Sequence, residues 1–490
     1  MKRRPPSNIE HFDVLIVGAG LSGIDAAYRL QSECSGKHYA ILEARDALGG
    51  TWDLFRYPGI RADSDMYTLG FPFRPWRGDI SIAPGDAIRD YIRETAEEYG
   101  IDRKIRFGHC ISRAAWSSET SRWTVEGTAA GKPFVLSCSF LSTCCGYYDY
   151  AQGYTPEFDG IENFSGQLLH PQQWPDQLDL AGKRVVVIGS GATAVTLIPS
   201  LAAQAARVTM LQRSPSYIVA MPAKDRIANW MRDKLPGRIA DALARWKNLG
   251  LAILLYQLAQ RRPERIRKAL LQRLRRQLGP AVDVDTHFSP AYKPWDQRLC
   301  LAPDGDLFKV LRSGQADIVT DHIQGFVENG IRLRSGRILA ADIVVTATGL
   351  NIKLMGGIEL LVDGEPVKLA DKLIYKGMML SDVPNLAFAF GYTNASWTLK
   401  CDLSAGYVCR LLNHMDRKGY QRCTPRPRDA GLTSVPMSTL RSGYLLRARG
   451  LVPRQGSRAP WRVHQNYVID LAVMKYTRVD DGVMEFGKAA

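Results

Sequence analysis

The sequence predicts an α/β fold with two parallel-sheet domains, one inserted within the other, and a further insertion of amphipathic helices. Two stretches indicate the sheets, because each reads as a strand, a glycine turn and a helix: Phe12–Val17 before Gly18–Gly23, and Arg184–Ile188 before Gly189–Ala194. Continuous apolar, β-branched runs of this length are typical of central strands covered on both faces. Between Met221 and Pro280 the apolar residues instead recur at helical spacing.

The first glycine turn has the spacing and setting of a dinucleotide-binding fingerprint. Gly18 permits a tight turn, Gly20 lets the backbone approach a pyrophosphate, and Gly23 lets the helix pack closely on the strand. Glu43 ends the next apolar strand, twenty residues beyond Gly23, where a carboxylate accepts hydrogen bonds from a ribose. A lone glycine turn is only a sharp bend, but strand, helix and acid together predict a bound dinucleotide.

The second glycine turn repeats the fingerprint at Gly189, Gly191 and Ala194, where alanine is a permitted third residue. The strand that follows ends at Arg213 and Ser214 rather than at an acid. Arg213 can pair with a 2′-phosphate and Ser214 can donate to it, which predicts NADPH rather than NADH; a solvated surface arginine is the alternative. Two dinucleotides in one chain indicate a hydride donor and a hydride acceptor.

The helical stretch 221–280 holds most of the positive charge of the chain. The formal net charge is +15, and fifteen Lys and Arg against four Asp and Glu place +11 of it in this stretch. Prolines at 222, 236, 263 and 280 predict short helices. Two apolar faces recur at helical spacing, one formed by Ile239, Leu243 and Trp246 and one by Ile266, Leu270, Leu274 and Leu278.

Three interpretations of this basic stretch stay open. Its charges are solvated and its apolar face covers a substrate pocket, or it attaches the protein peripherally to an anionic membrane, or it binds nucleic acid. No recognised nucleic-acid motif accompanies the charge, so nucleic acid is not an expected partner.

Two further strand-like runs end at a glycine and suggest how the domains are divided. Phe140–Cys145 precedes Gly146, and Ile343–Thr348 precedes Gly349, so each closes a stretch that one of the glycine turns begins. We therefore expect a first domain over residues 1–160, a second over 161–220 and 281–345, a helical insertion over 221–280, and a return to the first domain, with the C-terminal region, over 346–490.

Composition excludes several classes of protein. With 46% hydrophobic and 23% charged residues among 490, the chain is neither disordered nor fibrous. The longest apolar run, Leu249–Tyr256, is well short of the ~18 residues of a membrane-spanning helix. The basic N-terminus leads into Phe12–Val17 and a glycine turn without a cleavage site, so we expect a cytoplasmic protein with peripheral membrane association as the one alternative. Nine cysteines without a C-x-x-C pair predict no metal site and no disulfide scaffold.

The stretch before the second glycine turn contains F-x-G-x-x-x-H-x-x-x-W-P, with Phe164, Gly166, His170 and Trp174 in its fixed positions. It resembles the signature of the flavin-dependent Baeyer–Villiger monooxygenases, in its place as well as its letters. Related flavin monooxygenases that oxidise amines typically have Tyr at the position of Trp174. Without the resemblance, His170 and Trp174 would be buried supports of a linker, and we expect His170 to act at a hinge rather than as the chemical catalyst.

The resemblance covers almost the whole chain. Gly49–Trp52 resembles the loop that runs along FAD in these enzymes, which implies FAD in the first site and NADPH in the second. The subgroup that includes mycobacterial thioamide-prodrug activators and bacterial long-chain-alkane-degradation monooxygenases is similar in the stretches Asp285–Phe288, Lys293–Cys300, Pro303–Phe308, Tyr375–Leu380 and Gly391–Lys400. The implied fold is therefore two Rossmann-like domains, the NADP domain inserted in the FAD domain.

Arg298 matches the arginine that lies over the flavin in this family, and Asp63 matches the acid that pairs with it. In the implied chemistry, a peroxide at the flavin C4a attacks a ketone, and a guanidinium stabilises the resulting anions without donating a proton. A structural ion pair of Arg298 with Asp296 or another acid is the alternative. Many relatives have Lys where this chain has Gln297, which weakens strict selectivity for NADPH.

The fingerprints and the resemblance together predict two sets of site residues. Arg298 and Asp63 are the expected catalytic residues. The expected cofactor-binding residues are Gly18, Gly20, Ser22, Gly23, Glu43, Thr51, Trp52, Asp53, Leu54, Arg61, Asp63, Ile111, Gly189, Ser190, Gly191, Ala192, Thr193, Ala194, Arg213 and Ser214.

The expected activity is the conversion of small hydrophobic ketones to esters or lactones with O2, and of sulfides to sulfoxides. Oxygenation mainly at sulfur or nitrogen is the nearest alternative. A pyridine-nucleotide disulfide reductase shares both nucleotide folds but needs a redox cysteine pair beside the flavin, and none is visible. A non-enzymatic basic protein on membranes or DNA would leave both glycine turns and Arg298 unexplained.

Overall fold

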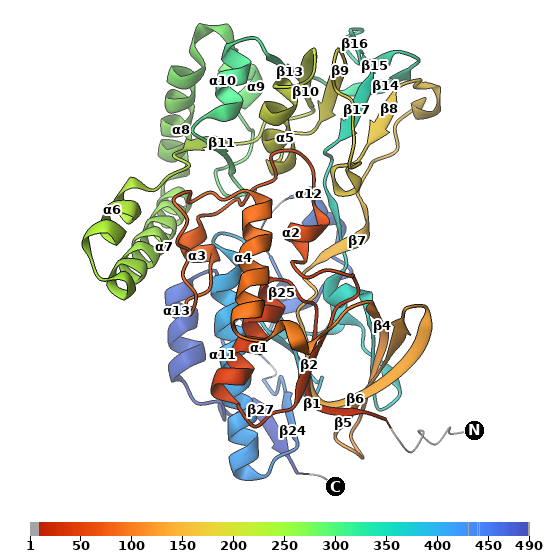
Figure 1. Cartoon of the computed structure of the whole chain (residues 1–490), viewed down its shortest axis with the longest axis vertical. Coiled ribbons are helices and arrows are strands. Elements are labelled where there is room, and N and C mark those ends of the chain that lie inside the picture. Colours follow the sequence, from red (N-terminus) through yellow and green to blue (C-terminus); the bar gives the residue numbers. More distant parts are fainter. Residues whose placement is uncertain (1–8, 430, 439, 441, 489–490) are drawn as a thin grey trace.

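The computed structural model describes residues 9–429, 431–438, 440 and 442–488. Two large sheets dominate the molecule, one near each end of its long axis (Figure 1). The first has nine strands in the order β20-β19-β4-β5-β6-β1-β2-β3, with β23 also paired to β6. Its strands are β1 His11–Val17, β2 Tyr39–Leu42, β3 Ile105–Arg106, β4 His109–Ser117, β5 Arg122–Ala129, β6 Lys132–Thr143, β19 Glu359–Val362, β20 Glu365–Pro366 and β23 Leu386–Phe388.

Strand β6 joins two kinds of pairing in this sheet. Its first half pairs antiparallel with β5, whereas its second half runs parallel to β1 and β23. The β1 strand is parallel to β2, which is parallel to β3. The carboxyl ends of the parallel strands therefore lie at one edge, where a nucleotide binds in such sheets.

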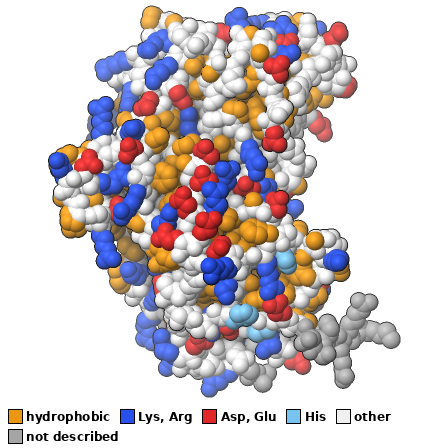
Figure 2. Space-filling model, in the orientation of Figure 1, with side chains coloured by type: hydrophobic (Ala, Val, Ile, Leu, Met, Phe, Trp, Pro, Cys, Tyr) orange, Lys and Arg blue, Asp and Glu red, His pale blue; other side chains and the backbone are white. Residues whose placement is uncertain are grey.

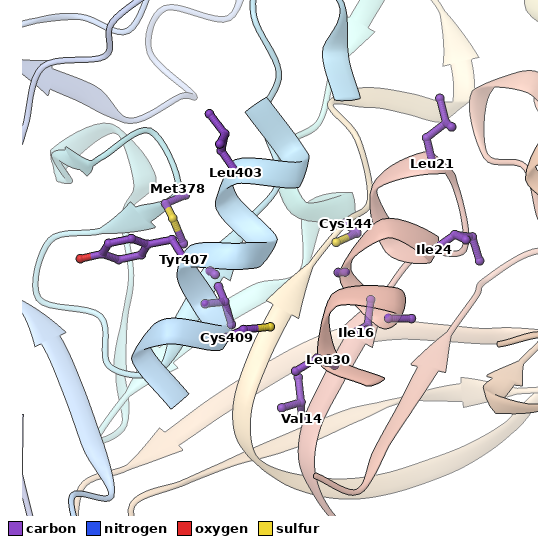
Figure 3. Close-up of a cluster of buried hydrophobic side chains, with 14 of the residues drawn as sticks. Val14, Ile16, Leu21, Ile24, Leu30, Cys144, Met378, Leu403, Tyr407 and Cys409 are labelled. Carbon is purple, nitrogen blue, oxygen red and sulfur yellow. The ribbon is translucent and has the colours of Figure 1, made fainter. Parts of the chain in front are cut away.

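Helices α1 (Leu21–Glu33) and α11 (Trp397–Lys418) cover this parallel part. Figure 3 shows Val14 and Ile16 of β1 beside Ile24 and Leu30 of α1, with Cys409 of α11 next to them. These side chains are almost completely buried. Burial of large aliphatic side chains stabilises the fold by about 1.5–3 kcal/mol each, so this core fixes α1 against β1 and with it the turn between them.

The second sheet has five parallel strands in the order β13-β10-β9-β17-β8. They are β8 Gln167–Leu169, β9 Arg184–Ile188, β10 Arg207–Gln212, β13 Ala316–Thr320 and β17 Ile343–Thr346. Helices α5 (Ala192–Ala202) and α10 (Asp306–Arg312) pack on it through a separate core. The fold class expected from the two glycine turns is confirmed.

Two antiparallel strands, β7 (Tyr148–Gly153) and β18 (Leu350–Ile352), connect the sheets. The chain passes from β6 through β7 to the second sheet, and returns from β17 through β18 to β19 in the first. This connectivity inserts the second sheet domain in the first, as the sequence predicts. The residue limits of the domains stay a prediction.

The basic stretch forms three helices, α6 Arg226–Lys234, α7 Gly237–Arg261 and α8 Pro263–Leu278. The prediction of short helices is wrong for α7, which has 25 residues. Pro236 and Pro263 stand at the N-termini of α7 and α8, where proline is tolerated, and so separate helices without breaking them.

The expected apolar face of α7 is formed, but it is not buried. Ile239, Leu243 and Trp246 are 52%, 45% and 49% exposed, whereas Ala240 and Ala244 on a neighbouring face are buried. Figure 1 shows α6 and α7 projecting from the side of the molecule. In α8, by contrast, Leu274 and Leu278 of the expected face are buried in the second core.

The other α-helices of the described residues are α2 Thr51–Leu54, α3 Met66–Leu69, α4 Gly85–Glu98, α9 Val284–Phe288, α12 Gly443–Arg447 and α13 Tyr467–Leu471. Four small sheets have two strands each: β11 (Ile218–Met221) with β12 (Cys300–Pro303), β21 (Ile374–Tyr375) with β22 (Met379–Leu380), β24 (Arg422–Pro425) with β27 (Met484–Gly487), and β25 (Ser434–Pro436) with β26 (Arg454–Gly456). A further sheet has three strands, β14 (Ile323–Val327), β15 (Gly330–Leu333) and β16 (Ile338–Ala340). Within the described residues, no helix combines the length and apolar character needed to cross a bilayer.

Candidate functional site

A cavity of about 2020 Å³ lies between the first glycine turn, the connecting strands β7 and β18, and helices α6–α8. It brings together many residues that the sequence singles out from distant segments. Those that line it are Gly18, Gly20, Ser22, Glu43, Thr51, Trp52, Arg61, Asp63, Ile111, Ala192, Thr193 and Arg298. The first predicted nucleotide site, the start of α5 and the expected catalytic arginine therefore share one space.

The first glycine turn is closed by backbone contacts. Gly18 has a φ of 104°, and a Cβ on it would lie 2.7 Å from the carbonyl oxygen of Cys144. A Cβ on Gly23 would lie 1.9 Å from the carbonyl oxygen of Gly18. Only glycine fits either position, because Gly18 lies with a positive φ against the chain that follows β6, and α1 starts in direct contact with Gly18.

The position of Gly20 leaves its backbone open to a ligand, since the atoms nearest to an added Cβ are backbone atoms of Gly50 at 3.5 Å and Gly49 at 3.9 Å. Glu43, at the end of β2, accepts hydrogen bonds from the backbone N–H groups of Ala19 (2.7 Å) and Arg45 (3.0 Å). Its two oxygens keep further lone pairs for a ribose. Burial raises the pKa of Glu43, and the hydrogen bonds from Ala19 and Arg45 oppose that shift. This cradle fits an adenine dinucleotide.

Only some of the predicted residues in the loop after Glu43 line the cavity. Thr51 and Trp52 line it, but Asp53 is 3% exposed, lies outside the lining and accepts hydrogen bonds from Arg45 and Arg56. Leu54 also lies outside the lining. Asp53 thus holds the loop in place rather than facing the space.

The second glycine turn has a different environment. A Cβ on Gly189 would lie 2.3 Å from the carbonyl oxygen of Ala347, whereas a Cβ on Gly191 would meet no heavy atom within 4 Å. Ala194 is fully buried. Ser190 donates to the carbonyl oxygen of Ser214 (3.0 Å) and so ties the turn to the end of β10. The open space before α5 fits a pyrophosphate at its N-terminus.

Arg213 and Ser214, just after β10, are exposed and lie outside the lining of the large cavity. Among the described residues Arg213 makes no ion pair, so its guanidinium is available to a phosphate. Gln297, in the loop before β12, is half-buried.

Arg298 reaches into the cavity from the loop before β12. Its Nε donates to the carbonyl oxygen of Thr393 (3.1 Å) and its Nη2 to that of Tyr392 (3.4 Å). Burial lowers the pKa of Arg298, but Tyr147, Tyr444 and Asp63 raise it, and the balance lies above its ordinary value. The side chain is therefore a permanent cation whose remaining N–H donors face the open space.

The expected pairing of Arg298 with Asp63 is not formed in this structure. Among the described residues, neither side chain has an ion-pair partner, and the alternative pair with Asp296 is not formed either. Burial raises the pKa of Asp63, and the charges of Arg298 and Arg61 oppose that shift. Arg61 itself pairs with Asp306 at the start of α10 and so joins the two sheet domains.

Sequence reasoning missed an aromatic group beside Arg298. Tyr147 and Tyr148 follow β6, and their hydroxyl groups are 2.7 Å apart. Trp397 stacks on Tyr147 with ring centroids 5.1 Å apart, and Tyr444 of α12 lies 6.4 Å from it. Trp397 also donates to Ser22 (3.0 Å), which ties this group to the first glycine turn. The aromatic pair after Gly146 is a sequence signal that could have been noticed, but nothing in the sequence indicates Tyr444.

The signature residues lie at the connection between the sheets. His170 donates from Nε2 to the carbonyl oxygen of Gly349 (3.2 Å), and its Nδ1 accepts from the N–H of Gln172 (3.1 Å). Burial lowers its pKa, so the ring is neutral and held by backbone. A Cβ on Gly166 would lie 2.4 Å from the ring of Phe164.

Trp174 packs against the core of the second sheet. None of the four signature residues lines the cavity, and His170 ties the segment before the second sheet to the returning chain at Gly349.

The sequence model described as flavin-binding monooxygenase-like matches residues 75–249, and the NAD(P)-binding Rossmann-like domain model matches residues 16–77. The FAD-containing monooxygenase EthA of Mycolicibacterium smegmatis is 53% identical over 480 residues, 98% of each chain. AlmA of Acinetobacter baylyi, named as an FAD-binding monooxygenase, is 48% identical over 482 residues, 98% of this chain and 97% of its own. A steroid monooxygenase solved with NADP has a similar fold, with a TM-score of 0.76, 21% identity and coverage of 98% of this chain and 100% of that one.

Proposed function

The chain belongs to the flavin-binding monooxygenase-like family, and from this premise we propose that it is a Baeyer–Villiger monooxygenase that uses NADPH to convert hydrophobic ketones to esters or lactones. Relatives named as FAD-containing or FAD-binding monooxygenases align with nearly its whole length, so the chain is an FAD-containing monooxygenase. The insertion of oxygen beside a ketone carbonyl is the finer part of the proposal.

One observation carries that finer part: Arg298 is a fixed cation in the cavity that also contains the first glycine turn and Glu43. Attack on a ketone places negative charge on its carbonyl oxygen. A guanidinium held by the carbonyl groups of Tyr392 and Thr393 can stabilise that charge, and it gives up no proton at working pH. Donors placed for an oxyanion contribute about 10²–10³ in rate.

FAD would be held by the first glycine turn and by Glu43, beside the lining residues Thr51 and Trp52. NADPH would be held by the turn at Gly189–Ala194, with Arg213 and Ser214 on its 2′-phosphate. When bound, FAD supplies activated oxygen after accepting hydride from NADPH. Asp63 would act on Arg298 through its charge, without a direct ion pair.

The aromatic side chains beside Arg298 would exclude water and present an apolar wall to the substrate. Burial raises the pKa of Tyr148 and of Tyr444, so both hydroxyl groups stay neutral. Neutral hydroxyl groups place no negative charge beside Arg298, so its positive charge stays available for the anion that develops on an uncharged substrate. Peripheral contact of residues 221–280 with a lipid surface, if it occurs, would bring apolar substrates close to the cavity but is not required by this activity.

Oxygenation of sulfides is a second candidate, because it needs no oxyanion and the same apolar wall would accept a thioether. The disulfide-reductase alternative is disfavoured by thiol chemistry. Cys144 and Cys145 line the cavity, but burial raises the pKa of Cys144 to about 12 and that of Cys145 above its ordinary value. Thiols of this kind hold little thiolate at neutral pH and are poor redox nucleophiles.

The test is an Arg298→Ala variant assayed for flavin content, NADPH oxidation and product. We expect full flavin, continued NADPH oxidation and a loss of ester formation by about 10²–10³, with hydrogen peroxide released instead. Arg298→Lys should recover only part of the activity, because it keeps the charge but not the planar fork. Arg332→Ala, on the distant strand β15, is the matched control. Normal ester formation by Arg298→Ala would overturn the proposal.

A further inference from the structure

Helix α7 and the adjoining α13 expose a group of large apolar side chains that we name the docking face. It consists of Leu243, Trp246 and Leu254 of α7 and Val468 and Ile469 of α13, which are 43–54% exposed. Trp246 meets Tyr467 with ring centroids 6.0 Å apart, so the two helices contribute to one surface. Figure 2 shows apolar and basic side chains together on this projecting part of the molecule. Contiguous apolar surface of this kind marks an interaction site.

The docking face continues into the mouth of the large cavity. Leu251 and Leu255 lie on the turns of α7 next to Leu254, and Trp230 lies on α6. All three line the cavity and are still 45%, 40% and 58% exposed. The cavity that contains Arg298 therefore opens at the docking face itself.

Exposed cations lie at both ends of helix α7, which carries most of this apolar surface. Arg238 lies near the start of α7, and Arg261, Arg262, Arg265 and Lys268 lie between its end and α8. They are exposed, and among the described residues none of them makes an ion pair. Apolar side chains with an aromatic anchor and a basic border are typical of helices that lie in the surface of an anionic membrane.

The positive charge of residues 221–280 also distinguishes between the partners that could cover the docking face. A second copy of the chain would bring two stretches of net +11 together, and that repulsion disfavours self-association. A nucleic acid would pair with the cations but leave the leucines against water. An anionic lipid surface satisfies both, because its headgroups meet the cations and its acyl region accepts the apolar side chains.

We propose that α6, α7 and α13 dock on an anionic lipid surface and that the cavity takes its substrate directly from that lipid through the mouth at Trp230, Leu251 and Leu255. The substrate class would then be long-chain, lipid-partitioned ketones or sulfides. This second part rests on the proposed monooxygenase function, whereas the docking itself does not.

The docking is tested by flotation of the flavin-loaded protein with vesicles of phosphatidylcholine, with or without about 30% phosphatidylglycerol, at about 0.05 M and 0.5 M salt. We expect flotation with the anionic vesicles at low salt and a loss of most of it at high salt. The Leu243→Gln, Leu254→Gln double variant should float about tenfold less. Ile338→Gln with Leu451→Gln, which also changes two exposed aliphatic side chains, should float like wild type.

A charge variant provides a second measurement, because Arg261→Glu with Arg262→Glu should lose flotation on anionic vesicles while keeping the wild-type melting temperature. Failure of the wild type to float on anionic vesicles would overturn the docking. Equal flotation of wild type and the leucine variant would also overturn it, as would a dimer in sedimentation that the leucine variant dissociates.

The substrate part is tested with two ketones, one short and water-soluble and one long-chain and held in anionic vesicles. The leucine variant should oxygenate the short ketone at the wild-type rate and the long-chain ketone about tenfold more slowly, because Leu243 and Leu254 do not line the cavity. Equal rates with both ketones would overturn delivery from lipid. Oxygenation of neither ketone by the wild type would overturn the proposed function, while flotation would still decide the docking.

Discussion

The two strand–turn–helix units share one pattern of small residues, and both are closed by backbone at the first glycine, but only the first unit is also closed at the third position. In the first, Gly23 is locked, because an added Cβ would lie 1.9 Å from the carbonyl oxygen of Gly18. In the second, buried Ala194 occupies that place, and Gly191 faces open space where Gly20 faces Gly50. The comparison separates two demands that one fingerprint combines, the packing of helix on strand and the approach of a nucleotide.

The largest effect should come from Gly23→Ala. Its Cβ would collide with backbone, so α1 must move away from β1, at a cost of about 3 kcal/mol of stability or more. We expect a clearly lower melting temperature and loss of bound flavin, measured by thermal unfolding and by flavin absorbance. Ala194→Gly is the matched control and should cost only about 1 kcal/mol. A fully flavinated, equally stable Gly23→Ala protein would contradict the distinction.

Gly191→Ala should break the second site without breaking the fold. Gly191 has a φ of −82°, which any residue adopts, and its Cβ would enter empty space. We expect unchanged melting and flavin content, with the KM for NADPH raised about tenfold or more because the Cβ occupies the approach of the pyrophosphate. Steady-state kinetics decide this. An unchanged KM would mean that the nucleotide approaches elsewhere.

Much of this pair of units is predictable because the signals are local. The strands begin within a residue or two of the predicted runs. The contact that requires glycine at position 23 is also local, because it is made with the carbonyl oxygen of Gly18. Gly166 is also predictable, since its neighbour Phe164 leaves no room for a side chain.

The surroundings of Arg298 could not be predicted in the same way. The carbonyl groups that hold it belong to Tyr392 and Thr393, almost a hundred residues away, and backbone acceptors leave no mark on the sequence. The spacing of apolar residues also did not indicate which face of α7 is buried, because apolar residues lie on nearly all sides of this helix.

Arg213→Ala should change the KM for NADPH without changing the KM for NADH. Arg213 is exposed and without an ion-pair partner among the described residues, so its pairing with a 2′-phosphate is screened by solvent. We expect the KM for NADPH to rise about tenfold while that for NADH stays the same. Parallel assays with the two cofactors make NADH the internal control. Equal changes in both would show that Arg213 supports the fold instead.

The smallest effect should come from His170→Gln, at the connection between the units. Burial holds the pKa of His170 below its unfolded value, so the unfolded chain binds more protons as the pH falls below about 6.5 and stability is lost there. The wild type should therefore lose more melting temperature than the variant between about pH 7.5 and pH 5.5. Identical losses would mean that His170 is not the group responsible.

Cys144 and Cys145 give the cavity an unusual chemical property. In the proposed reaction, hydrogen peroxide that escapes would be released into the cavity that Cys144 and Cys145 line. Peroxide attacks the thiolate rather than the thiol, and burial keeps both groups protonated. We therefore expect these two cavity thiols to resist oxidation by peroxide, for the same reason that they are poor redox nucleophiles.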